Sequence, residues 1–125
     1  MIRNFLLVGI GGALGTMLRY GCNLFIWHKQ FPLATLLINT TGSFIIGVAV
    51  AYALKNETFA ANWRLFLTTG ICGGFTTFSA FSLENIQLLE SGKFAMAALY
   101  IAASILLGIA AVWLGFKFVT LVTTA

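Results

Sequence analysis

The chain has 125 residues, of which 60% are hydrophobic and only 8% are charged, whereas about a quarter of the residues of an ordinary soluble domain are charged. This composition excludes a soluble globular domain and predicts an integral membrane protein made mostly of helix. The net charge of +4 comes from scattered single charges, and without a basic stripe nucleic acid is not expected as a partner. The length leaves room for one domain, which we predict to span residues 1–125.

Charged residues divide the chain into four apolar stretches, at roughly 4–27, 33–54, 65–89 and 94–118. Each stretch is long enough to cross a bilayer core of about 30 Å as a helix. The separators HKQFP, KNETFAANWR and ESGK are short, which favours antiparallel neighbours, and in the second of them Asn62 is the expected helix cap. The sequence therefore predicts an up-down-up-down bundle of four transmembrane helices with both termini on one side of the membrane.

Lysine and arginine are nearly balanced between the two ends of this predicted bundle. The end with the termini and the second separator has four of these residues, and the opposite end has three. A chain without a strong positive-inside signal could insert in both orientations. Two oppositely oriented copies could then pair about an axis in the membrane plane, which is a hypothesis of dual topology.

The first stretch contains GIGGALGTMLRY, whose glycines resemble a loosened dinucleotide-binding turn. No strand precedes them and the first acidic residue is Glu57, so that interpretation fails. Gly11 and Gly15 lie one GxxxG step apart and are better explained as a face for close helix packing. Arg19 lies near the end of this stretch, where a long cation could reach the interface or could neutralise a buried group. We favour a structural anchor, because long cations near helix ends routinely reach the interface.

The second stretch contains TLLINTTGSF, which places Thr35 and Asn39 on one helical face. An asparagine at bilayer depth is costly unless its amide is paired. Its donors and acceptor suit either a bond between helices or the replacement of water around an ion. From position alone the interhelical bond is favoured, and pore lining stays open.

The third stretch, TTGICGGFTTFSAFSLEN, concentrates glycines, hydroxyls and aromatic residues at the expected middle of the membrane. Glycine pairs and threonines weaken a helix, and a broken helix at this depth is tolerated only inside protein or beside a wet cavity. We predict a break there, of the kind in which channels and transporters place ion sites. Phe75, Phe78 and Phe81 follow as a ridge, and the positive edge of an aromatic ring can face an anion. Glu84, one turn further on, is either a functional acid or an anchor at the end of the span.

The fourth stretch carries Tyr100, Ser104 and Gly108 at four-residue steps, which form one face of a helix. Its hydroxyls, joined with the polar residues of the other stretches, give a line of hydrogen-bond donors without an excess of fixed charge. Such a lining suits a small anion that exchanges its hydration shell for protein donors.

Through GGALGTMLRY, TLLIN and above all GICGGFTTFSAFSLE, the chain resembles the Fluc family of bacterial fluoride channels over nearly its whole length. The resemblance implies an antiparallel homodimer with four membrane helices per subunit and two separate pores. It also implies passive fluoride export across the bacterial inner membrane, driven by the gradient and the membrane potential. The expected partners are fluoride, sodium, membrane lipid and a second copy of the chain.

The family's motif positions assign the ion path in this sequence. The resemblance implies that Asn39 is the pore asparagine and that the ring edges of Phe78 and Phe81 line the path. A polar track would accompany them, with Gly108 standing where a third track hydroxyl can occur and Ala80 where threonine is frequent. The hydroxyl donors of this predicted path are Thr35, Thr77, Ser79, Tyr100 and Ser104.

The resemblance also implies a structural sodium ion at the dimer interface. Backbone carbonyls of the helix break would hold it, and here they would belong to Gly73 and Thr76 of each subunit. We expect structural roles for four further residues of the motifs: Gly11, Gly15, Arg19 and Gly74.

Four rival functions have less support from the sequence. A proton-coupled exporter needs an acid deep in the bundle, but the first two stretches have none and Glu84 comes late in the third. Proton-coupled fluoride antiport is a nearer rival, which conductance would separate from a channel. One histidine, no aspartate and two isolated cysteines do not supply the constellation of an enzyme, a metal site or a disulfide framework. A scaffold subunit without transport would tolerate changes at Asn39 and at the phenylalanines.

Overall fold

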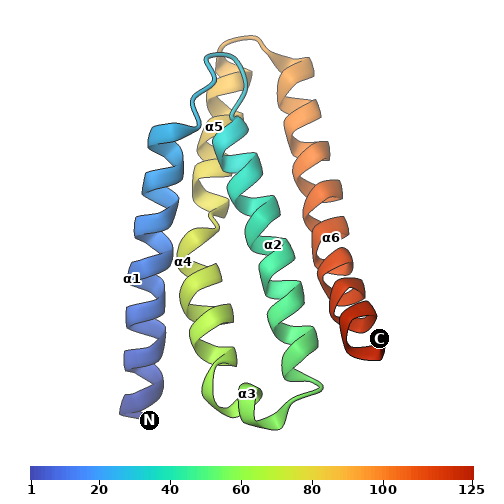
Figure 1. Ribbon diagram of the computed structural model, residues 1–125. Coiled ribbons are helices and arrows are strands. Elements are labelled where there is room, and N and C mark those ends of the chain that lie inside the picture. The colour runs from blue at the N-terminus through green and yellow to red at the C-terminus, as the bar shows by residue number, and fades with distance from the viewer.

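The computed structural model describes all 125 residues and is helical almost throughout (Figure 1). Four of its segments are long and apolar enough to cross a membrane, which confirms the four predicted spans. The bundle runs up and down, and both termini lie at the same end of it (Figure 1). The unbroken spans are α1 (Ile2–Phe25), α2 (Leu33–Ala53) and α6 (Phe94–Thr124).

The third span is built from three pieces, which are η1 (Phe66–Cys72), α4 (Gly73–Phe75) and α5 (Phe78–Glu90). The first piece is a π-helix, which is wider than an α-helix and occurs often at functional sites. An extended segment at Thr76 and Thr77 separates α4 from α5. The predicted break in the third span is therefore confirmed.

The predicted ends of the spans agree with the helices to within two residues, with one exception. α6 continues to Thr124, six residues beyond the predicted end at 118. The predicted end followed the charge of Lys117, but a single lysine near the interface does not stop a helix, and no glycine or proline follows it.

The connection after α2 contains a short helix, α3 (Glu57–Asn62). Its cap is Asn56, whose Oδ1 accepts a hydrogen bond from the Phe59 N–H at 2.8 Å. The prediction that Asn62 is the cap was wrong, because this residue ends α3 and accepts a hydrogen bond from Arg3 at 3.1 Å. The later connection turns at Gly92, the one residue with a positive φ, 74°.

Two close helix pairs hold the bundle together. α2 packs most extensively against α6, where a Cβ added to Gly47 would lie 2.5 Å from the Val112 carbonyl oxygen. α1 packs against η1 and α4, where a Cβ on Gly11 would lie 2.7 Å from the Phe66 carbonyl oxygen. Glycine is needed at both contacts because any side chain would separate the backbones, as expected for a small-residue packing face.

The buried core is small, as lipid rather than water surrounds the bundle. Only 19 of the 125 residues are buried, and many large apolar side chains of α1 and α6 face outward. The main apolar cluster joins α2, α5 and α6 around Tyr100, which is fully buried. The polar residues predicted to line an ion path lie beside this cluster or at the break.

Candidate ion pathway at the break in the third span

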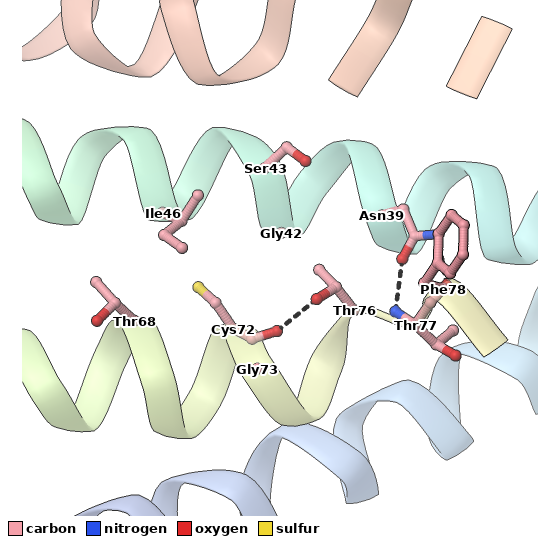
Figure 2. A pocket seen from close by; sticks show the side chains of 10 residues that line it. All are labelled: Asn39, Gly42, Ser43, Ile46, Thr68, Cys72, Gly73, Thr76, Thr77 and Phe78. Carbon is pink, nitrogen blue, oxygen red and sulfur yellow. Dashed lines mark hydrogen bonds between the residues drawn. The ribbon is translucent and has the colours of Figure 1, made fainter. Parts of the chain in front are cut away.

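Asn39 of α2 joins the broken span to its neighbour. Its Oδ1 accepts a hydrogen bond from the Thr77 N–H at 2.7 Å (Figure 2). Its Nδ2 donates to the Thr77 carbonyl at 3.0 Å. The favoured interpretation of this asparagine as an interhelical bond is therefore correct. The amide nitrogen has a second hydrogen, so the same side chain still has a donor to offer to an ion.

The break leaves backbone carbonyls without their usual helical donors, among them those of Gly73 and Thr76. In a continuous helix the Thr77 N–H would donate to the Gly73 carbonyl and the Ala80 N–H to the Thr76 carbonyl. Here the Thr77 N–H is bonded to Asn39, and the Ala80 N–H donates to the Thr77 hydroxyl at 3.1 Å. The Gly73 and Thr76 oxygens thus lose their usual donors at membrane depth, where such groups need another partner.

A third carbonyl of the break is bonded from α1. The Gly74 oxygen accepts hydrogen bonds from Arg19 Nε at 3.1 Å and from the Thr16 hydroxyl at 3.4 Å. Arg19 is half-buried and therefore holds the break rather than reaching the interface. Gly74 has no room for a side chain, since a Cβ there would lie 2.3 Å from the Gly12 carbonyl oxygen.

A cavity of about 330 Å³ lies between α2 and the broken span (Figure 2). Its walls are mostly polar or glycine, and Phe78 at its edge is 78% exposed. Gly73 and Ser79 are exposed too, so one chain leaves polar groups uncovered at mid-membrane. The residues around the cavity are Asn39, Gly42, Ser43, Ile46, Thr68, Cys72, Gly73, Thr76, Thr77 and Phe78.

A row of aromatic rings leads away from the break toward the α1–α2 connection. The ring centroids of Phe78 and Phe81 are 5.5 Å apart, and those of Phe81 and Tyr100 are 5.0 Å apart at an interplanar angle of 60°. Phe31 follows, 5.4 Å from Tyr100 at 75°. The sequence pattern predicts the first three rings but not Phe31, which lies in a connection outside the periodic pattern.

Glu84 of α5 joins two of the predicted track hydroxyls. Thr35 donates to its Oε1 and Tyr100 donates to its Oε2, each at 2.6 Å. Both donors are buried, so the carboxylate belongs to the interior network and is not an anchor at the end of the span. Of the two roles left open for Glu84, these contacts favour the functional one.

The remaining predicted donors differ in their surroundings. The Thr77 and Ser79 hydroxyl oxygens are 3.2 Å apart at the start of α5. The hydroxyl of Ser104 is buried and has no hydrogen-bond partner. The Oδ1 atom of Asn85 is also buried without a partner. Asn85 was missed by the sequence analysis, although an asparagine directly after an acidic residue in an apolar span is a usable signal. A buried hydroxyl without a partner is a donor available to a ligand.

A family model described as CrcB-like protein, Camphor Resistance (CrcB), matches residues 6–116. The chain belongs to this family. It is 45% identical over 119 residues to a fluoride-specific ion channel FluC of Azobacteroides pseudotrichonymphae, covering 93% of this chain and 95% of the relative. A protein of the same name in Granulibacter bethesdensis is 48% identical over 120 residues, with 93% and 94% covered.

A further relative, the fluoride-specific ion channel FluC 1 of Listeria innocua, is 44% identical over 118 residues, with 92% of this chain and 96% of the relative covered. The resemblance to fluoride channels found in the sequence is thereby confirmed. With its four apolar spans, the chain is a multi-pass membrane protein of a bacterial ion-channel family.

Proposed function

We propose that this chain forms a fluoride-selective channel that lets fluoride leave the cell passively across the inner membrane. The observation that carries the proposal is the line of neutral donors and ring edges from Asn39 to Tyr100. It runs beside a broken helix in a chain whose relatives are named fluoride-specific ion channels.

The geometry suits a small, strongly hydrated anion. A dry path must replace the hydration shell with close donors, yet hold the ion weakly enough to release it. The free N–H of Asn39 and the unpartnered hydroxyl of Ser104 supply neutral donors. The edges of Phe78 and Phe81 add positive electrostatic potential without a fixed charge.

Thr35 and Tyr100 supply donors in a different way, because Glu84 already accepts from both. A fluoride ion at these hydroxyls takes the place of a carboxylate oxygen as the acceptor. The exchange of one anionic acceptor for another keeps the number of hydrogen bonds constant, which favours passage over tight binding.

A second copy of the chain completes the site in this proposal. Mid-membrane polar groups beside a broken helix must be covered by protein or water, and in one chain the backbone of Gly73 and the hydroxyl-bearing Ser79 are exposed. The near balance of lysine and arginine between the two ends favours pairing with an oppositely oriented copy. Such a dimer would contain two equivalent paths. A single orientation of labels placed at both termini in cells would contradict it.

A sodium ion fits the freed carbonyls of Gly73 and Thr76. Unwound carbonyls are the usual ligands of Na⁺ at broken membrane helices. One chain offers two such carbonyl oxygens, and a second copy related by a two-fold axis would bring the number of sodium ligands to four. When bound, the ion would supply a fixed positive charge between the subunits, which favours anions nearby.

The experiment is ion efflux from proteoliposomes loaded with fluoride or chloride, with and without a potassium ionophore. The native chain is compared with Phe81→Ile and with Phe5→Ile, a matched change at a residue that is 73% exposed on α1. We expect fluoride efflux that needs the ionophore, collapses in Phe81→Ile and persists in Phe5→Ile.

Two results would refute the proposed channel function. Absence of flux under every gradient would indicate a scaffold subunit, and fluoride flux that follows a proton gradient without the ionophore would indicate an antiporter.

A further inference from the structure

A second polar pocket lies at the end of the bundle formed by the α1–α2 and α5–α6 connections, where these two loops meet in Figure 1. This loop-end pocket has a volume of about 220 Å³. It differs from the cavity at the break, with which it shares no residue. The lining residues that matter here are His28, Lys29, Phe31, Glu84 and Lys93.

The loop-end pocket is joined to the ion path by two lines of contact, which share Tyr100. The aromatic row from Phe78 through Phe81 and Tyr100 ends at Phe31, which lines the pocket. The hydrogen bonds from the buried hydroxyls end at Glu84, which also lines it. Both lines leave the membrane interior at the same place.

The charges around the loop-end pocket favour an anion. Lys29 and Lys93 line it from the two connections, and Glu84 is the one acidic residue among its walls. Both carboxylate oxygens of Glu84 are engaged by donors from the interior. The Nδ1 of His28 accepts hydrogen bonds from the N–H groups of Gln30 at 3.4 Å and Phe31 at 3.3 Å, and so fixes the loop that carries Lys29.

We propose that the loop-end pocket is the mouth at which the fluoride path meets water, and that Lys29 and Lys93 concentrate fluoride there. The proposal rests on the channel function given above and assigns the place of entry and exit. Clefts lined by one sign of charge raise the local concentration of the opposite ion and its rate of capture. Because the lysines act through water and not by direct contact, their effect must disappear when salt screens them.

The test is the single-channel fluoride current of Lys29→Gln/Lys93→Gln in planar bilayers at low and high ionic strength. Two charges about 10 Å from an ion in water change its local concentration about threefold at a Debye length of about 30 Å. We therefore expect a current about threefold below that of the native chain in dilute fluoride, and a current close to native in about 1 M salt.

Lys55→Gln/Lys117→Gln is the matched control, because it removes two lysines from the opposite end of the bundle. In an antiparallel dimer these lysines lie on the same side of the membrane as the partner's loop-end pocket, so they report the general surface charge. The control should leave the current within about 1.3-fold of native. Lys29→Arg/Lys93→Arg keeps the charges and should retain the native current.

The outcomes separate this proposal from the channel function. If the native chain carries fluoride and the glutamine pair keeps the native current and salt dependence, the mouth lies elsewhere and the proposal is overturned. An equal loss in the control pair would assign the effect to general surface charge and would also overturn it. A native chain without fluoride current would refute the channel function and the mouth together.

Discussion

Alanine at Gly15 should separate α1 from the broken span and destabilise the protein. A Cβ at this position would lie 2.2 Å from the Ile71 carbonyl oxygen and 2.8 Å from the Phe75 backbone nitrogen. Both atoms belong to the backbone, so no rotamer change can relieve the overlap. α1 must therefore shift by about 1 Å to restore ordinary packing distances, and such overpacking destabilises.

The size of the effect follows from three contributions. Overpacking costs about 1–3 kcal/mol, with the upper end appropriate for a backbone contact. Alanine regains up to about 1 kcal/mol through its greater helix propensity. The shift also strains the hydrogen bond from Arg19 to the Gly74 carbonyl, 3.1 Å long, and loss of a bond from a charged donor costs about 1.5–3 kcal/mol. We expect a net loss of about 2 kcal/mol if the Arg19 bond only weakens, and of up to about 5 kcal/mol if it breaks.

The assay is thermal unfolding in detergent, followed by circular dichroism and by the monodisperse fraction in size-exclusion chromatography. Gly9→Ala is the matched control, since an added Cβ there meets nothing within 4 Å. The control should unfold at or slightly above the native temperature, and Gly15→Ala clearly below it. Equal unfolding temperatures for the two variants would refute the close packing of α1 on the break.

Two further variants test the path itself. Tyr100→Phe removes a hydroxyl that donates to Glu84 at 2.6 Å and should lower the fluoride current about tenfold, for a loss of about 1.4 kcal/mol. The control Tyr20→Phe, at a residue that is 67% exposed, should leave the current unchanged. Similar currents in both variants would show that Tyr100 does not contribute to the path. Asn39→Leu leaves the Thr77 N–H and carbonyl unpaired, which should cost about 1–3 kcal/mol of stability for each group. It should also abolish the fluoride flux, so the variant is measured by thermal unfolding and by liposome efflux. Native behaviour in both assays would contradict the role of this amide.

The sequence was sufficient for the features that depend on local composition. Runs without charge define the four spans, and the glycines and threonines between Thr68 and Thr77 predict the break, because they weaken a helix wherever it lies. Close packing at Gly11 and Gly15 was predictable for a similar reason, since small residues one turn apart have few other uses in lipid.

The sequence was not sufficient for contacts that depend on how the helices rotate and slide against one another. The bond from Arg19 to Gly74 joins residues 55 positions apart, and the bonds of Glu84 join three different helices. Nothing local to Glu84 distinguishes an interior network from an anchor at the membrane surface. The wrong cap at Asn62 has a simpler origin, because two asparagines lie in one connection too short for periodicity to choose between them.

The most direct test of the central claim is the zero-current potential of the purified protein in a planar bilayer with fluoride on one side and chloride on the other. A fluoride-selective channel predicts a steady current whose zero-current potential follows the fluoride gradient and ignores changes in the chloride concentration. A potential that follows chloride or protons, or a bilayer that carries no current above the baseline, would contradict the account.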